Sequence, residues 1–335
     1  MAKSKKSGKK SSKTNKPVVK EEKISEKEKK VTEKVAEKKE KVSEKKTEKT
    51  AKAEKVEKTE KTEKVEEKKV ISSKKEDGFF KKFFAKKYDE NESILTIFKD
   101  KRVYGALLGE VFGTMMIALV IFTLGLYQPL YMFFVLVAIV VAVYKLSGAN
   151  LNPINTVGMM ATRRMSVIRG VLYLLAQVIG AWFAVLVMTG FLNASAALSG
   201  TEVELPGMAA IEENYYWIVS FLEFLGATIV GFFFARAQQV RKNTLAFAAI
   251  VAGGVTIAMI VVYLLSYTYF GLQGNFMMNP AIALLYQILP QAADGVGELL
   301  LEIGKALFTY VLFPMVGGVV GFYLSDAASV LAEEK

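Results

Sequence analysis

The sequence predicts an all-α membrane protein with six transmembrane helices and two shorter half-helices, preceded by a disordered tail rich in Lys and Glu. Three observations support this fold class. Lys and Glu dominate the first part of the chain, six apolar runs follow, and two Asn-Pro dipeptides interrupt the apolar part at Asn152-Pro153 and Asn279-Pro280. An unpaired backbone polar group is costly in a bilayer, so non-helical backbone at membrane depth belongs where it lines a water-filled cavity. The two dipeptides therefore predict one pore.

The charge of the chain is concentrated in its first third. Residues 1–102 carry 35 Lys and Arg against 21 Asp and Glu, a net charge of +14, whereas residues 103–335 carry 9 against 12. Glu-Lys repeats with isolated Val and Thr cannot bury an apolar face. We therefore expect residues 1–90 to form a disordered basic cytoplasmic tail. A coiled coil is the alternative, but the isolated Val and Ile residues do not maintain paired heptad positions.

Aromatic and basic residues alternate at the end of this tail. The phenylalanines are Phe79, Phe80, Phe83 and Phe84, and lysines flank each pair. Such a cluster suits the anionic cytoplasmic surface of a membrane, and a short solvated linker is an equally good interpretation. We expect the tail to contact anionic lipid or a cytoplasmic partner that the sequence does not identify.

The chain contains neither cysteine nor histidine. This composition excludes disulfides, thiolate chemistry, imidazole bases and the usual zinc sites. We accordingly expect no enzymatic activity, no cofactor and no metal site.

Six apolar runs have about the length needed to cross a hydrocarbon layer of about 30 Å. They cover residues 104–126, 130–147, 167–191, 216–239, 244–267 and 305–325. Two shorter apolar stretches, 152–162 and 279–289, are too short to span. We place the channel domain at residues 103–325 and a short cytoplasmic C-terminus at residues 326–335.

The distribution of Lys and Arg predicts the topology, because basic residues near span ends remain on the cytoplasmic side. Arg163, Arg164 and Arg169 follow the second span, and further basic residues follow the fourth. The segment between the third and fourth spans is acidic. Both termini are therefore predicted to be cytoplasmic, in a multi-pass protein of the plasma membrane.

Each half of the channel domain has the order span, span, half-span, span. Glu110 lies in the first span of one half and Glu223 in the first span of the other. Three crossings per half invert the second copy, an arrangement that places a site near the membrane midplane. Asn is a good N-cap and Pro suits the first helical turn, so each Asn-Pro predicts the start of a half-helix. The two half-helix N-termini should meet in the middle of the membrane.

These residues resemble the aquaporin and glycerol-facilitator channels of the major intrinsic protein family. The segment Ser147 to Ile154, Ser-Gly-Ala-Asn-Leu-Asn-Pro-Ile, is similar to the first box of the family, with Asn150 where His is usual and Ile154 where Ala is usual. Asn279-Pro280-Ala281 keeps the second box intact. The Glu-x-x-x-Thr pattern of the first span and the Ala-Gln and Phe-Pro segments of the third and sixth spans occur in the order of the family.

The resemblance also assigns four selectivity-filter positions, to Met132, Tyr267, Phe276 and Ile282. Ile282 takes the place of the Arg that normally follows the second box. A shift of one residue in the fifth span would replace Tyr267 by Ser266 or Thr268. The filter that the resemblance implies is uncharged, and its selectivity is expected to differ from that of the relatives at Ile282.

The resemblance implies a passive channel that forms a homotetramer of independent pores. The amides of Asn152 and Asn279 would orient hydroxyl groups, and the expected solutes are glycerol or related polyols, with water as a second permeant. Glu110 and Glu223 would accept hydrogen bonds from the half-helix loops. Alternatives are a water-selective channel, a proton-coupled secondary transporter in which these carboxylates carry protons, and a membrane anchor whose tail performs the function.

Overall fold

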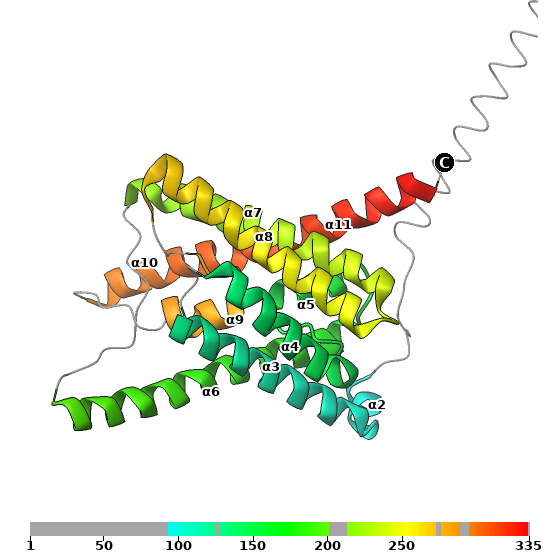
Figure 1. The fold of residues 1–335 in the computed structure, drawn as a ribbon, viewed down its shortest axis with the longest axis horizontal. Helices are drawn as coiled ribbons and strands as arrows, with labels where there is room; N and C mark the ends of the chain where they lie inside the picture. Colours follow the sequence, from blue (N-terminus) through cyan, green and yellow to red (C-terminus); the bar gives the residue numbers. More distant parts are fainter. Residues whose placement is uncertain (1–92, 125–127, 201–212, 273–275, 289–294, 334–335) are drawn as a thin grey trace, which may run out of the picture. The chain divides into compact units, whose positions relative to one another are not determined.

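The computed structural model describes residues 93–124, 128–200, 213–272, 276–288 and 295–333 (Figure 1). The predicted tail, residues 1–90, lies outside the described residues. Within the described part of the chain, six helical segments are long and apolar enough to cross a membrane. The predicted all-α membrane fold with six spans is therefore confirmed.

The first half of the channel domain consists of three long helices and one short helix, after a single-turn helix at its start. Their bounds are α2 Ile94–Lys99, α3 Arg102–Leu124, α4 Pro129–Ser147, α5 Pro153–Ala161 and α6 Val167–Ser199.

The second half repeats this order of long, long, short and long helices, and its last long segment consists of two helices, α10 and α11. After a 3-10 turn at Glu213–Tyr215, its bounds are α7 Tyr216–Ala237, α8 Thr244–Phe270, α9 Pro280–Ala283, α10 Val296–Leu307 and α11 Phe313–Glu333. A second 3-10 turn, Gln238–Val240, follows α7. Two π-helical turns, Leu284–Ile288 and Phe308–Leu312, follow α9 and α10.

Local sequence signals explain the ends of these helices. Pro129 is the first residue of α4, where its missing N–H is not needed. Gly148 ends that helix with φ 81°, a left-handed conformation that glycine adopts without strain. Asn243 caps α8 by accepting a hydrogen bond from the Ala246 N–H at 3.1 Å.

Two segments are longer than the sequence indicated. Helix α6 has 33 residues and continues to Ser199, beyond the predicted end at residue 191. The last helical segment runs from Val296 to Ala332 with 37 residues. Helix α11 also continues past residue 325, where we ended the channel domain, to Glu333. Residues 326–333 are therefore helical and continue the sixth span.

The packing of the helices follows the internal repeat. Helix α3 packs on α4 and α6, and α7 packs on α8 and α11; between the halves, α4 packs on α8, α5 on α11 and α6 on α9. Gly180 of α6 lies against the Val111 carbonyl of α3, and Gly317 of α11 lies against the Phe224 carbonyl of α7. These equivalent glycines allow the same close helix approach in both halves.

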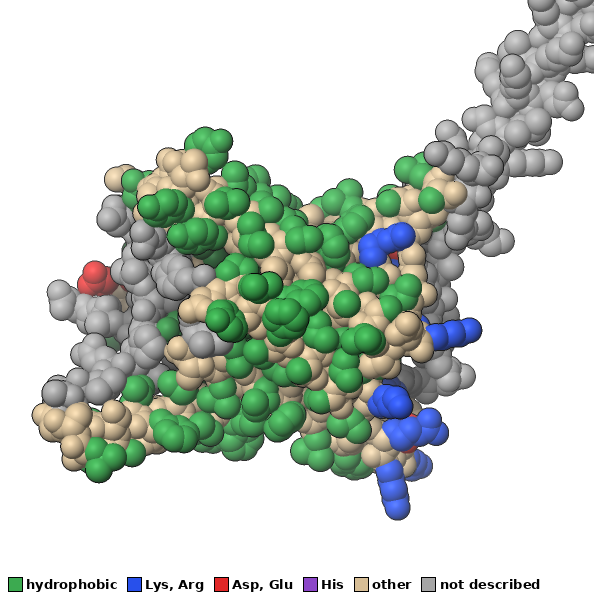
Figure 2. All heavy atoms as spheres, in the orientation of Figure 1, with side chains coloured by type: hydrophobic (Ala, Val, Ile, Leu, Met, Phe, Trp, Pro, Cys, Tyr) green, Lys and Arg blue, Asp and Glu red, His purple; other side chains and the backbone are tan. Residues whose placement is uncertain are grey.

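Figure 2 shows a surface covered by apolar side chains, with Lys and Arg gathered at the right end of the view. Large apolar side chains are exposed in the described part of the chain, among them Leu108, Phe134 and Trp217, which are 68%, 63% and 65% exposed. Six membrane-capable helices with such a surface describe a multi-pass membrane protein.

Candidate pore and its half-helix junction

Each Asn-Pro dipeptide starts a short helix. Asn152 is extended, with φ −155° and ψ 129°, and its Oδ1 accepts a hydrogen bond from the Ile154 N–H at 2.9 Å. Asn279 has φ −147° and ψ 95°, and its Oδ1 accepts from the Ala281 N–H at 3.2 Å. Pro153 and Pro280 are the first helical residues. Both asparagines therefore act as N-caps, and their oxygens are committed to the helices that they start.

The two caps also bind each other's loops. The Asn152 Nδ2 donates to the Met278 carbonyl at 2.7 Å, and the Asn279 Nδ2 donates to the Leu151 carbonyl at 3.3 Å. Leu151 and Met278 precede the caps and have positive φ, 54° and 45°. This conformation is strained for residues with large side chains, and it turns both carbonyls towards the opposite half. Each amide has two hydrogens, so a second one is available beyond this reciprocal contact.

A buried carboxylate holds each loop. Glu110 accepts from the Asn150 N–H at 3.0 Å and the Leu151 N–H at 2.7 Å. Glu223 accepts from the Met277 N–H and, at 2.9 Å, from the Met278 N–H. Both side chains are 0% exposed. The backbone N–H groups of these strained loops make no helical hydrogen bonds. The carboxyl groups of Glu110 and Glu223 supply their acceptors.

The two halves differ in what supports the carboxylate. Gln177 of α6 donates from Nε2 to Glu110 Oε2 at 2.7 Å and contacts the Thr156 Oγ1 at 2.9 Å, which connects α3, α5 and α6. When the halves are aligned on Gly180 and Gly317, Pro314 of α11 takes the place of Gln177. The sequence alone marks this glutamine only as part of a helix motif, because its partners lie 67 and 21 residues away in the chain.

A cavity lies along the junction of the half-helices. Its apolar wall comes mainly from α3, α4 and α8 and includes Ile117, Leu136, Val140, Val251, Val255 and Met259. Its polar side chains are Asn150, Asn152, Asn155 and Asn279. None of the described residues that line it is charged. The cavity therefore presents amide groups on one side and hydrocarbon on the other.

One helical turn beyond the cavity, two aromatic rings meet. Tyr144 follows Val140 on α4 and Phe247 precedes Val251 on α8, and their ring centroids are 4.6 Å apart. The Tyr144 hydroxyl donates to the Arg241 carbonyl at 2.6 Å. This contact joins α4 and α8 next to the basic segment that follows α7.

Of the four predicted filter residues, the structure brings three into one apolar core. Met132 lines the cavity, whereas Phe276 and Ile282 are 5% and 0% exposed and belong to the same hydrophobic cluster without lining the cavity.

Tyr267 is not placed with the other three. It is 49% exposed and stacks on Tyr263 with a centroid distance of 5.7 Å. An α-helix turns about 100° per residue, so Tyr267 lies about 160° from the cavity-lining Val251, whereas Ser266 lies about 60° from it. Ser266 is 0% exposed. Of the residues that the sequence left open at this position, Ser266 is the one on the buried side of α8 that carries the cavity-lining residues.

The third residues of the two boxes are buried. Ile154 and Ala281 are 0% and 1% exposed. The Ile154 side chain lies against Gly318 of α11, where an added Cβ would overlap it. The larger residue in the first box is thus accommodated by a residue without a side chain on the neighbouring span.

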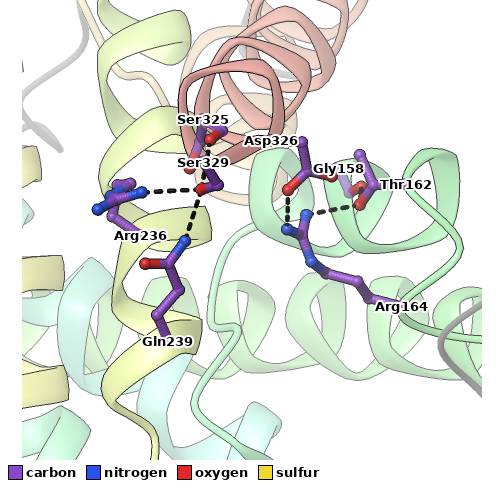
Figure 3. A network of polar contacts seen from close by, with 8 residues as sticks. All are labelled: Gly158, Thr162, Arg164, Arg236, Gln239, Ser325, Asp326 and Ser329. Atoms are coloured by element: carbon purple, nitrogen blue, oxygen red, sulfur yellow. Dashed lines mark hydrogen bonds and ion pairs between the residues drawn. The ribbon is translucent and has the colours of Figure 1, made fainter. Parts of the chain in front are cut away.

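A polar network ties the end of the first half-helix to the last span (Figure 3). Arg164 forms an ion pair with Asp326, donates to the Thr162 Oγ1 at 2.9 Å and lies over the Phe322 ring at 5.3 Å. The side chains of Arg164 and Asp326 are 12% and 9% exposed. A partly buried pair of this kind fixes the position of α5 against α11.

The same end of α11 also contacts α7 (Figure 3). The Ser329 hydroxyl accepts from Arg236 at 2.8 Å and from Gln239 at 2.7 Å, and it donates to the Ser325 carbonyl at 2.9 Å. At the end of the molecule where Lys and Arg gather, α11 is therefore joined both to the segment that follows α5 and to the end of α7. Among the described residues, no group of three or more His, Cys, Asp or Glu could hold a metal ion.

Comparison with known proteins identifies one family. The family model described as major intrinsic protein matches residues 97–326. No curated protein matches the chain. Among solved structures, the aquaglyceroporin from Plasmodium falciparum is similar, with 16% sequence identity and a TM-score of 0.46 over 68% of this chain and 96% of that chain.

Proposed function

Because this chain belongs to the major intrinsic protein family, whose members are channels for small solutes, we propose that it is a passive channel for small neutral solutes. Glycerol or a related polyol is the favoured solute, and water is a second permeant. The observation that carries the proposal is the junction of the two caps. There the Asn152 and Asn279 amides each keep a second hydrogen beside a cavity whose described lining residues are uncharged.

The environment of the cavity favours neutral solutes over ions. An ion that enters loses hydration and finds no countercharge among the described lining residues. Each half-helix N-terminus contributes up to about half a positive charge. At about 5 Å and an effective dielectric near 20, this repels a cation by roughly 1.7 kcal/mol per helix. A polyol carries hydroxyl groups for the amides and C–H groups for the apolar wall, and it separates no charge.

We assign the narrow part of the pore to Met132, Ser266, Phe276 and Ile282. All four are buried and none is charged, so this part of the pore offers few hydrogen-bond donors. An arginine at position 282 would supply hydrogen-bond donors, and Ile282 supplies none. Water depends on such donors for its binding more than a polyol does, because a polyol also has a hydrocarbon side that contacts the apolar residues. This difference supports the preference for polyols over water.

Orientation, assembly and the tail complete the proposal. We place both termini in the cytoplasm and the protein in the plasma membrane, because Lys and Arg gather at one end of the described residues (Figure 2). A homotetramer is typical of the family. The basic tail would contact anionic lipid or a cytoplasmic partner.

Stopped-flow measurements on proteoliposomes test this function. Glycerol flux should rise in proportion to the gradient and should not respond to an uncoupler, and water flux should be lower relative to glycerol than in a water-selective channel. Fast water flux without glycerol flux would support the water-selective alternative. Saturable uptake that collapses with the uncoupler would support a proton-coupled transporter.

A further inference from the structure

Asn155 lines the cavity, and its side chain carries a buried oxygen atom that has no partner within the described part of the chain. This atom is the Oδ1, and the residue is 3% exposed. The Nδ2 of the same amide donates to the Asn150 carbonyl at 2.8 Å, which fixes which end of the amide is the oxygen. An unpaired buried acceptor costs about 1–3 kcal/mol, and such groups are rare in folded proteins.

The position of Asn155 relates this oxygen to the caps. Asn155 follows Asn152 by three residues at the start of α5, so it lies about 4.5 Å further along the helix axis. Asn152 and Asn279 offer amide hydrogens at the junction, and Asn155 offers an acceptor one turn away. A solute with hydroxyl groups on a three-carbon chain can cover this spacing.

The carbonyls nearest to the junction already have partners. The Leu151 carbonyl accepts from Thr114 and Asn279, and the Asn150 carbonyl accepts from Asn155. The Asn155 Oδ1 is thus a buried acceptor, on a residue that lines the cavity, that no described group of the protein uses. If the Asn155 side chain is replaced, the hydrogen bonds from the loop backbone to Glu110 remain and hold the loop in its conformation.

We propose that Asn155 is a solute-binding residue that accepts a hydrogen bond from a second hydroxyl group of a neutral polyol while the Asn152 and Asn279 amides donate to the first. This deepens the proposed function and rests on it. Water can occupy either position, but only a polyol brings two hydroxyl groups on one molecule together with C–H groups for the apolar wall. Asn155 therefore favours polyols over water and over solutes with a single hydroxyl group.

The test compares two variants of equal shape, Asn155→Thr and Asn155→Val. Both lose the bond from the Asn155 amide to the Asn150 carbonyl, and only the threonine keeps an oxygen that can accept. The readout is the ratio of glycerol to water permeability of the full chain in proteoliposomes. This ratio should fall about tenfold in Asn155→Val, the effect of about 1.4 kcal/mol on a rate. In Asn155→Thr it should stay at least about threefold above the Asn155→Val value, since a hydroxyl supplies part of the lost interaction.

A matched control is Thr256→Val on α8. The Thr256 Oγ1 is also buried without a partner among the described residues, but Thr256 does not line the cavity. The ratio of glycerol to water permeability in Thr256→Val should equal that of the original chain. Equal ratios in Asn155→Thr and Asn155→Val, or an unchanged ratio in Asn155→Val, would overturn the role of Asn155 while leaving the channel function intact. Absence of glycerol flux in the original chain would refute the proposed function, and the role of Asn155 with it.

Discussion

Replacement of Glu110 by Gln should destabilise the first half-helix loop. The carboxylate accepts from the N–H groups of Asn150 and Leu151 and from Gln177. An amide has one oxygen, and its best orientation keeps Leu151 and Gln177 on that oxygen while its NH2 group faces the Asn150 N–H. One hydrogen bond is lost and the buried Asn150 N–H is left without an acceptor, which costs about 1–3 kcal/mol. A loss of this size lowers the melting temperature by roughly 2–12 °C in a domain of about 200 residues.

The assay is thermal unfolding in detergent, followed by glycerol and water flux in proteoliposomes. Glu223→Gln is a second test from the same repeat, because Glu223 accepts from Met277 and Met278 in the same way. It should lose about as much stability, since one N–H is again left facing an amide. Glu302→Gln is the control. Its pair with Lys305 at 2.9 Å is partly exposed, so the loss should stay below about 1 kcal/mol.

The competing interpretation makes Glu110 a proton carrier. In that case Glu110→Gln would keep its melting temperature, and uptake would lose its response to a proton gradient. In the interpretation based on the loop contacts, the variant loses stability and conducts both glycerol and water less well, with no change in their response to pH gradients. A stable variant with altered proton dependence would refute the structural role that we assign to this carboxylate.

Three further variants, and Gly190→Ala as a control, test the contacts around the pore. Asp326→Asn should lower the unfolding free energy by about 2–3 kcal/mol, because Arg164 loses its charged partner; an unchanged melting temperature would show that the pair does not hold α5. Gly317→Ala should cost about 1–3 kcal/mol through overlap with a backbone carbonyl of α7, whereas Gly190→Ala, with open space around it, should be neutral or stabilising by up to about 1 kcal/mol. Ile282→Ala should raise the flux of a four-carbon polyol relative to glycerol, and an unchanged ratio would remove Ile282 from the constriction.

The half-helices could be predicted from the sequence because their signals are local. An Asn that caps and a Pro at the first helical position act within three residues, and both predicted starts, Asn152 and Asn279, are the caps in the structure. The carboxylates Glu110 and Glu223 were recognised through the repeated motif. Their bonds to the loops cross 40 to 55 residues and could be assigned only by resemblance.

Other features depended on distances that the sequence does not contain. The sequence left the α8 position of the filter open between Ser266, Tyr267 and Thr268, because an alignment without gaps counts residues, whereas the buried face of α8 depends on the helical period. Asn155 was missed because a polar residue within a helix usually faces solvent or a neighbour. Only the structure shows that this residue lines a cavity and that its buried oxygen has no partner among the described residues. The contact of Ile154 with Gly318 links two spans and is equally invisible to local patterns.

The two half-sites are equivalent in their caps but not in their support. Glu110 is held by Gln177, whose side-chain amide also contacts Thr156 of α5, whereas Pro314 in the equivalent place of α11 has no side-chain donor. Helix α5 has nine residues, whereas α9 has four before a π-helical turn begins. Among the described contacts, Glu110 therefore has a side-chain partner, Gln177, that Glu223 lacks. Three of the residues that we assign to the narrow part of the pore, Ser266, Phe276 and Ile282, lie in this second half, so solute preference can change there while the network around Glu110 keeps the junction in place.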